Sequence, residues 1–321
     1  SLFSLLYKFR LNYVRIKLGE HMKKIISLII LILSIYFAYT YRENIVNFYN
    51  EYFVPIEDKI TNLEKNKYYR DIDYAYLKNT TNFIPNNKDD ILKIYFTIVN
   101  SGMEEFTFYC PKEYQNCLND VNDIANNQNT ISSINNFVHP YNSFKTLKTE
   151  IESTGKITVN IEKVYDDESI VILNYKVDEI LSKEITTNLN QKEKIKKIHD
   201  YIVNHTTYDK ERSDKKNINY RSDNAYGVLI ENYGLCGGYT DAMMLFLEKL
   251  NIPNYKISTE NHIWNYVKID NKWLHLDLTW DDPITKDNRD ILDYSYFLID
   301  DDRLSELEKE EHNYDKNIYK K

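Results

Sequence analysis

The stretch that decides the fold is Tyr233-Gly-Leu-Cys236-Gly-Gly-Tyr239, a cysteine inside a glycine cluster. Apolar residues recur at helical spacing after the cysteine and predict a helix from Cys236 to Leu250. Backbone N–H groups at a helix start favour negative charge and so stabilise a thiolate. We expect Gly234, Gly237 and Gly238 to leave room for a substrate carbonyl, beside N–H groups that form an oxyanion hole. The competing interpretation is a small buried cysteine with no catalytic role.

A histidine and an aspartate follow the cysteine at a spacing that a hairpin brings together. The segments around 255–258, 264–269 and 272–279 alternate as strands do, and Asp270-Asn271 suits a two-residue turn. If Ile269 faces Lys272, the register puts His262 and Asp277 diagonally on one face. The opposite face then collects the apolar residues Ile263, Val267, Ile269, Leu274, Leu276 and Leu278. A slip of one residue would move Asp277 to the wrong face.

Thiol, imidazole and carboxylate in this order are the parts of an acyl-transfer site. Each has an alternative: His275 and His199 compete with His262, and Asp277 can be a strand-end cap like Asp281 and Asp282. No cysteine–histidine cluster has the spacing of a known metal site, so we expect no metal and no other cofactor.

Residues from about 190 to 300 resemble the transglutaminase-like superfamily, a papain-type group of cysteine enzymes. The motifs that carry the resemblance are Tyr226-Gly-Val-Leu229, Gly234 to Tyr239, Ile252-Pro253, Asn261-His-Ile-Trp-Asn265 and Trp273 to Pro283. The resemblance implies an α+β fold, with the cysteine-bearing helix packed on an antiparallel sheet, and a catalytic triad of Cys236, His262 and Asp277. Gly237 and Ile263 depart from the usual residues and border the substrate cleft. Tyr226 and Trp264 are candidates to line that cleft or complete the oxyanion site, with core packing as the alternative.

The N-terminal part predicts a membrane segment. Lys23-Lys24 precede an uncharged apolar run from Ile25 to Tyr39, slightly short of a full span. Basic residues before it and an acidic body after it place the N-terminus in the cytoplasm. We favour an uncleaved signal anchor over a cleaved signal peptide, because bulky residues follow the run. Met22 is a candidate start site, which makes residues 1–21 an extension left out of the fold reasoning.

The charge and the cysteines limit which partners and which compartment are expected. Residues 1–42 carry seven basic side chains against one acidic one, and residues 43–321 carry 34 against 48, a net charge of −14. An acidic body argues against nucleic acid as the partner. Cys110 and Cys117 are close enough for a local disulfide outside the cytoplasm, with two separate buried thiols as the alternative. The tyrosine-rich, glycine-poor composition favours a bacterial source.

The domain hypothesis is a cytoplasmic basic arm at 1–24, a transmembrane signal anchor at 25–41, a connector at 43–70, an accessory α+β domain at 71–185 and the transglutaminase-like domain at 190–321. Within the accessory domain we expect helices over 89–99 and 118–125, and a strand over 156–164. That strand should form a hairpin with residues 170–175 across a turn at Asp166-Asp167-Glu168. An amphipathic helix is expected from Gln191 to Asn204.

These elements predict an enzyme outside the cytoplasm that transfers acyl groups from peptide or glutamine amides. Water as acceptor makes it a cysteine protease or amidase, which we favour, and an amine makes it a cross-linking transglutaminase. A third hypothesis is a surface module that binds peptide or glycan without catalysis. The expected partners are a protein or peptide substrate, in the cell wall or at the cell surface, and the membrane.

Overall fold

The computed structural model describes residues 2–53, 60–71, 77–214, 218–283, 292–307 and 310–319. The chain divides into two compact units, Ser1–Lys59 and Ile60–Lys321. The expected connector at 43–70 crosses this boundary. Its last part lies in the second unit, where Ile60 and Leu63 pack against the hydrophobic core.

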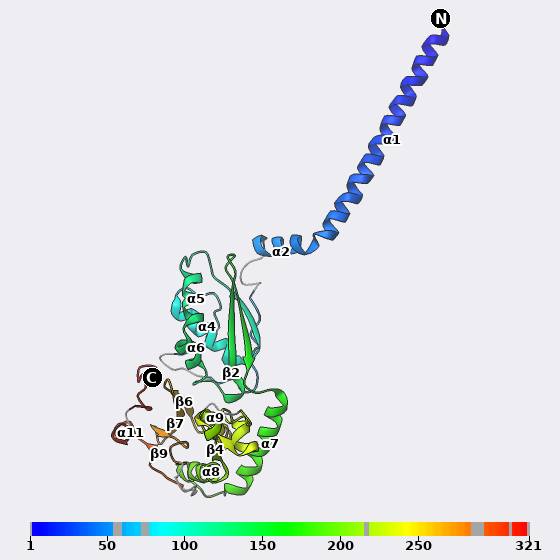
Figure 1. Cartoon of the computed structure of the whole chain (residues 1–321). Coiled ribbons are helices and arrows are strands. Elements are labelled where there is room, and N and C mark those ends of the chain that lie inside the picture. Colours follow the sequence, from blue (N-terminus) through cyan, green and yellow to red (C-terminus); the bar gives the residue numbers. More distant parts are fainter. Residues whose placement is uncertain are drawn as a thin grey trace. The chain divides into compact units, whose positions relative to one another are not determined.

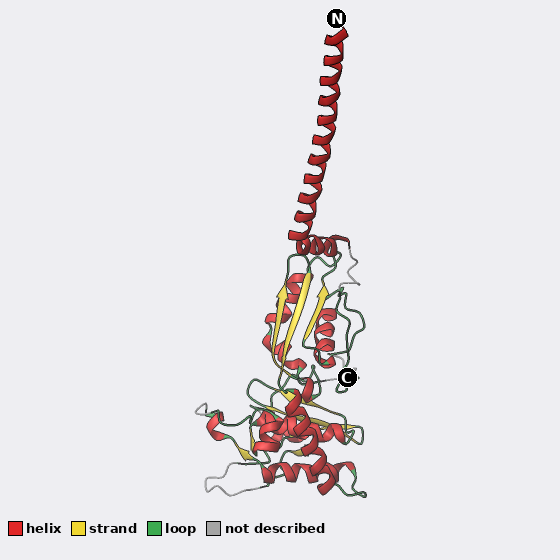
Figure 2. Ribbon diagram, turned by 90° about the vertical axis from the view of Figure 1, so that its right-hand side faces the viewer, coloured by secondary structure: helices red, strands yellow, loops and turns green. Residues whose placement is uncertain are grey.

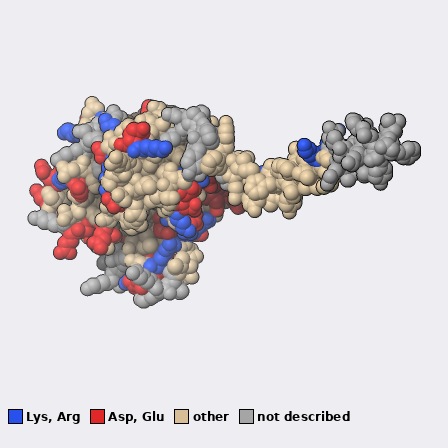
Figure 3. All heavy atoms as spheres, turned by 90° about the horizontal axis from the view of Figure 1, so that it is seen from above, with Lys and Arg blue, Asp and Glu red and all other residues tan. Residues whose placement is uncertain are grey.

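Within its described residues, the first unit contains the helices α1 (Leu2–Thr40) and α2 (Arg42–Phe53) (Figure 1). Among the described residues, His21–Thr40 is the one helical stretch long and apolar enough to cross a membrane. Its large apolar side chains are exposed, and Figure 3 shows this stretch almost without charge, with basic atoms at one end. The apolar run predicted at 25–41 therefore coincides with a helix whose apolar surface the protein leaves uncovered.

The second unit begins with an accessory region, residues 60–165, built on a three-stranded antiparallel sheet (Figure 2). The strand order is β1 (Glu105–Tyr109), β3 (Lys156–Lys163), β2 (Phe144–Ile151). Its helices are α4 (Lys88–Ser101), α5 (Cys117–Asn126), α6 (Gln128–Ile134) and the short 3₁₀ turn η1 (Pro140–Asn142). The side chain of Asn87 caps α4 by accepting the backbone N–H of Asp90.

The hairpin expected between residues 156–164 and 170–175 is wrong. Residues Asp167–Glu184 form the helix α7, and β3 pairs with β1 and β2 instead. Asp166 caps the helix by accepting the backbone N–H of Ser169, and Asp167 and Glu168 complement the first turn. The expectation followed the apolar run 170–173, whereas the buried residues are Leu173, Val177 and Ile180, at helical spacing.

A cysteine region, residues 166–319, completes the second unit. The predicted helices are present as α8 (Gln191–His205) and α10 (Cys236–Lys249). A four-stranded antiparallel sheet runs in the order β6 (Asn254–Ser258), β7 (Ile263–Ile269), β8 (Lys272–Leu276), β9 (Phe297–Ile299). The shorter elements are β4 (Thr207–Tyr208), α9 (Lys210–Ser213), the π-helical turn η2 (Gly227–Glu231), β5 (Tyr233–Gly234) and α11 (Asp301–Leu307).

The four-stranded sheet is covered on both faces. Val267, Ile269 and Leu276 face a cluster that includes residues of α7, α8 and α10. Tyr255, Ile257 and Trp264 join a second cluster that continues into the accessory region. The two regions therefore share hydrophobic core, and β7 carries His262 at its start between the two clusters. The fold is a mixed α+β arrangement with the cysteine-bearing helix packed on an antiparallel sheet, as expected.

Candidate active site

Cys236 is the first residue of α10 and is partly exposed. The preceding residue, Leu235, is extended, and its backbone N–H donates to the carbonyl of Ser222 (2.7 Å). This bond turns the chain sharply from β5 into the helix. The first N–H groups of a helix have no partner within it, so the sulfur lies at the positive end of the α10 dipole.

The hairpin of β7 and β8 has the predicted register. Ile269 pairs with Lys272 and Asn265 with Leu276, and the turn residues Asp270 and Asn271 have φ of 49° and 62°. β8 ends at Leu276, three residues earlier than expected, so Asp277 leaves the sheet directly beyond the last pair. Its carboxylate still reaches the imidazole of His262, with 2.5 Å between Nε2 and Oδ2.

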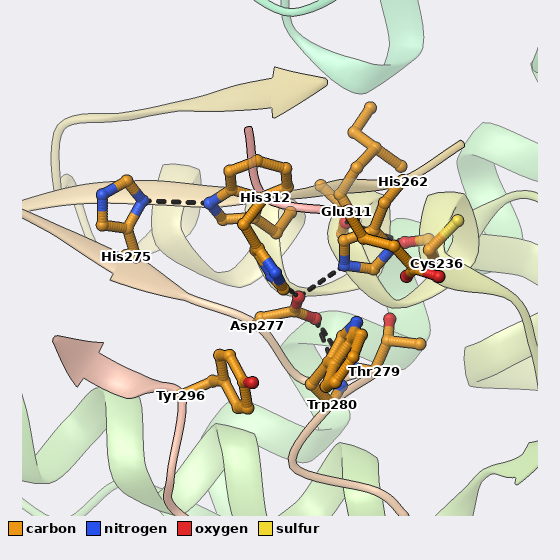
Figure 4. Close-up of polar contacts among 12 residues, drawn as sticks. Cys236, His262, His275, Asp277, Thr279, Trp280, Tyr296, Glu311 and His312 are labelled. Atoms are coloured by element: carbon orange, nitrogen blue, oxygen red, sulfur yellow. Dashed lines mark hydrogen bonds and ion pairs between the residues drawn. The ribbon is translucent and has the colours of Figure 1, made fainter. Parts of the chain in front are cut away.

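His262 and Asp277 each stabilise the charged form of the other. Burial alone would lower the pKa of His262, but the charge and hydrogen bond of Asp277, followed by the interaction with Cys236, raise it to about 10. Burial would raise the pKa of Asp277, but His262 and then His312 hold it well below its usual range. Because Nε2 is bonded to Asp277, the other nitrogen of His262 is left for the thiol. Figure 4 shows Cys236 and Asp277 on opposite sides of the His262 ring.

A second histidine, His312, contacts the same carboxylate oxygen. Its Nε2 lies 2.9 Å from Oδ2 of Asp277, and the side chain is fully buried. The backbone N–H groups of Thr279 and Trp280 donate to the other oxygen, Oδ1 (3.0 and 3.3 Å). The sequence analysis missed His312, since it lies in an acidic segment without periodicity and 35 residues beyond Asp277.

His262, Asp277 and His312 also have the residue types of a metal site, with ligand atoms within 4.8 Å of one another. Around tetrahedral zinc, bonds of about 2.0–2.1 Å put ligand atoms about 3.3 Å apart. Here the two nitrogens are 2.5 and 2.9 Å from the shared oxygen, which are hydrogen-bond distances. The arrangement fits a hydrogen-bonded network better than a metal site.

Comparison with protein families agrees with this geometry. Residues 179–278 match the model of the transglutaminase-like superfamily, a stretch that includes Cys236, His262 and Asp277. The chain carries a transglutaminase-like domain. At the level of the superfamily, this supports a thiol-dependent enzyme.

A solved structure described as "Crystal structure of a TGase" is similar to the chain, with 18% sequence identity and a TM-score of 0.34. The similarity covers 46% of this chain and 47% of that one, so the match spans about half of the solved protein. A search of curated proteins finds no match.

The glycines after Cys236 allow a close approach of the protein's own backbone. A Cβ atom on Gly238 would lie 2.3 Å from the carbonyl oxygen of Ser222, and one on Gly237 would lie 2.8 Å from that of Asp223. Both glycines therefore let the 221–224 loop cross the start of α10 at close range. The loop brings Asp223 and Asn224 to the site, and Gly237 lines the larger pocket described below together with Cys236.

Trp264 and Tyr226, the two aromatic candidates, do not line the pockets described below. Trp264 is buried, stacks on His262 with 5.6 Å between ring centroids, and donates from Nε1 to Nδ1 of His275 (3.0 Å). Tyr226 packs against the cluster around α7, α8 and α10, and the guanidinium of Arg221 lies 3.2 Å from its ring centroid. Trp264 thus packs against the face of the His262 imidazole, and Tyr226 packs against the core.

Two pockets meet at the thiol of the transglutaminase-like domain. The larger, of about 860 Å³, lies between the two regions, and the smaller is about 480 Å³. Cys236, Asn261 and His262 line both. Polar residue types such as Ser132, Asn135, Asn224 and Thr259 make up most of the lining of the larger pocket, whereas Tyr208, Trp280, Asp282 and Glu311 line the smaller. A substrate with its reacting bond at the sulfur would thus extend into both pockets, one on each side of that bond.

The competing histidines form other pairs. His199 bonds Asp281 (3.1 Å), and His275 bonds Asp301 (2.9 Å). Neither histidine lines a pocket that contains Cys236. Of the sequence candidates, the structure brings together the cysteine, His262 and Asp277. It also joins Cys110 and Cys117 in a disulfide within the accessory region.

Proposed function

We propose that the protein is a cysteine hydrolase that cleaves peptide or side-chain amide bonds outside the cytoplasm. The observation that carries the proposal is the position of His262, held between the Cys236 thiol and the Asp277 carboxylate where two pockets meet. In this proposal Cys236 is the nucleophile, His262 transfers the proton, and Asp277 orients the imidazole.

The reaction takes two steps. The thiolate of Cys236 attacks the amide carbonyl and forms a C–S bond, while first-turn N–H groups of α10 stabilise the oxyanion. The C–N bond then breaks, and the imidazolium of His262 gives its proton to the leaving amine. Water attacks the resulting thioester with His262 as general base, which releases the acid and restores the thiol–imidazole pair.

Placement outside the cytoplasm rests on two observations. The first unit carries an apolar helix preceded by basic residues, which is the pattern of an anchor with a cytoplasmic N-terminus. The accessory region carries the Cys110–Cys117 disulfide, a bond that persists in oxidising compartments. Both support a substrate at the cell surface, such as surface protein or cell-wall peptide.

One observation favours an amine as the alternative acceptor. The smaller pocket is lined by the carboxylic side chains Asp282 and Glu311 together with Tyr208 and Trp280. Acidic and aromatic groups attract a primary ammonium group. An amine that binds there and reaches the thioester would replace water, and the product would be an isopeptide cross-link.

Alkylation of the thiol tests the chemistry directly. With the full chain in detergent, iodoacetamide should label Cys236 rapidly near neutral pH, and His262→Ala should slow labelling by about 10²-fold or more. His205→Ala, an exposed histidine on α8, is the matched control and should not change the rate. Slow labelling that does not depend on His262 would refute the enzyme and favour the non-catalytic binding module.

A second experiment distinguishes the acceptors. The full chain is incubated with surface proteins and a labelled primary amine, and cleavage and amine incorporation are read together by mass spectrometry. New termini or deamidated glutamines without incorporation indicate hydrolysis, whereas incorporated label indicates transamidation. Cys236→Ala should abolish both products, and any product that persists in this variant comes from another protein.

A further inference from the structure

The carboxylate of Asp277 is bonded more completely than a triad requires. His262 contacts Oδ2 at 2.5 Å, His312 contacts the same oxygen at 2.9 Å, and two backbone N–H groups donate to Oδ1. The residue is almost fully buried. A carboxylate whose two oxygens both accept hydrogen bonds cannot rotate without breaking one of them. The bond from His312 therefore helps to hold Oδ2 where it accepts from His262.

His312 is itself held in place by its surroundings. Its ring stacks on Tyr296 (centroids 5.3 Å apart) and meets Trp264 (4.7 Å) and Trp280 (5.4 Å) edge to face. The neighbouring carbonyl of Glu311 accepts the hydroxyl of Thr259 (2.9 Å). The histidine is therefore a fixed donor that the segment 310–319 delivers to the site.

We infer that His312 is a positioning residue that donates to Oδ2 of Asp277 and so keeps the carboxylate aligned with His262. The inference rests on the proposed function, since it concerns the same site. His312 acts through Asp277 and does not touch the sulfur or the substrate. Other titratable groups near its ring are His262, His275 and Tyr296. Asp301, Tyr314 and Lys316 line a pocket with His312, and His275 is bonded to Asp301.

The alternative is that His312 only fills space among aromatic rings, and three variants separate the two roles. His312→Leu removes the donor and keeps an apolar side chain. His312→Gln places an amide N–H near the position of Nε2. His199→Leu is the matched control, because it removes a buried histidine that bonds Asp281 and packs on Tyr294 and Phe297, and not on Trp264 or His312.

The readout is the rate of Cys236 alkylation by iodoacetamide as a function of pH, with the full chain in detergent. His312→Leu should slow alkylation at pH 7 about tenfold and move the acid limb of the profile upward by about one pH unit, the usual effect of a lost charge-assisted hydrogen bond. His312→Gln should restore most of the rate and the position of the limb. His199→Leu should lower thermal stability and leave the profile unchanged.

Several outcomes would overturn the inference. They are an unchanged profile in His312→Leu, equal losses in the Leu and Gln variants, or the same shift in His199→Leu. If His312→Leu does not fold, His312→Gln and His312→Asn give the same test, since they are alike in polarity and only Gln reaches Nε2. Slow, His262-independent labelling of the wild type would instead refute the proposed function, and thus the two failures are distinguishable.

Discussion

The accessory region and the cysteine region are both helices packed on an antiparallel sheet, yet they bury different polar groups. The accessory region buries mainly neutral side chains such as Thr97, Asn100, Ser101 and Asn142. The cysteine region buries many ionisable ones: His199, Asp209, Asp241, Lys256, His262, His275, Asp277, Asp281 and His312. Burying charge is costly unless each group is paired, and such sets gather where chemistry needs shifted pKa values. The comparison marks the cysteine region as the functional one.

The largest expected effect comes from neutralising the central buried charge. Asp277→Asn keeps the shape of the side chain but no longer holds His262 as an imidazolium, so turnover should fall about 10³- to 10⁴-fold. The pKa of His262, raised to about 10 by Asp277, should fall toward its ordinary value in an NMR titration. Asn100→Ala in the accessory region is the control, and it should reduce stability without reducing turnover. Equal losses of turnover in both variants would contradict the comparison.

The next effect concerns the buried ion pair of Lys256 and Asp241. The ammonium lies 2.7 Å from Oδ1 of Asp241, whose other oxygen accepts the hydroxyl of Tyr165 (2.7 Å). Lys256→Met leaves the carboxylate unpaired and should lower the free energy of unfolding by about 3–5 kcal/mol.

Removing both charges, as Lys256→Met with Asp241→Leu, should recover most of this loss in urea unfolding. Asn142→Ala in the accessory region should cost only about 1–3 kcal/mol. If Lys256→Met lowers the free energy of unfolding no more than Asn142→Ala does, the two regions do not differ in the cost of removing a buried polar group.

The pH dependence of stability should separate His262 in the cysteine region from His139 in the accessory region by sign. The pKa of His262 is raised above its unfolded value, so its contribution is complete below about pH 6.5 and is lost as pH rises through about 10. Unfolding in urea at pH 6, 8 and 10 should show a loss on the order of a few kcal/mol, and Asp277→Asn should flatten it.

His139 in the accessory region should act in the opposite direction. Burial, and then the charges of Arg70 and Lys256, hold its pKa well below the usual value. It therefore favours unfolding as pH falls below about 6.5, because the unfolded chain then binds a proton that the folded one excludes. His139→Gln should weaken the acid-side loss and leave the alkaline one unchanged.

The smallest effect is expected from the disulfide of the accessory region. Replacing both Cys110 and Cys117 with alanine opens a loop with a sequence separation of seven and should lower the free energy of unfolding by about 2 kcal/mol. Alkylation of Cys236 should keep its rate and pH profile. A change in that profile would show that the accessory region controls the chemistry of the site.

Much of this site follows from local rules of sequence. The Asp270-Asn271 turn fixes the register, and the register places His262 close to Asp277. The helix beginning at Cys236 follows from the apolar spacing after it. In each case a short stretch of chain sets the geometry, with only neighbouring residues involved.

The rest depends on contacts between distant segments. His312 reaches Asp277 across 35 residues, through an acidic stretch without a pattern that predicts its path. Residues 170–175 lie within helix α7 but contain a β-branched run that favours a strand. The capping signal of Asp166 favours a helix, and the helix forms. The close packing of Gly237 and Gly238 on the 221–224 loop depends on a crossing that no spacing reveals.

The position of His312 along the chain also matters for the order of synthesis. Cys236, His262 and Asp277 leave the ribosome before His312 does, and on the inference drawn above they form an imperfectly aligned site until the segment 310–319 docks. Full reactivity of the thiol would then wait until the segment 310–319 has docked.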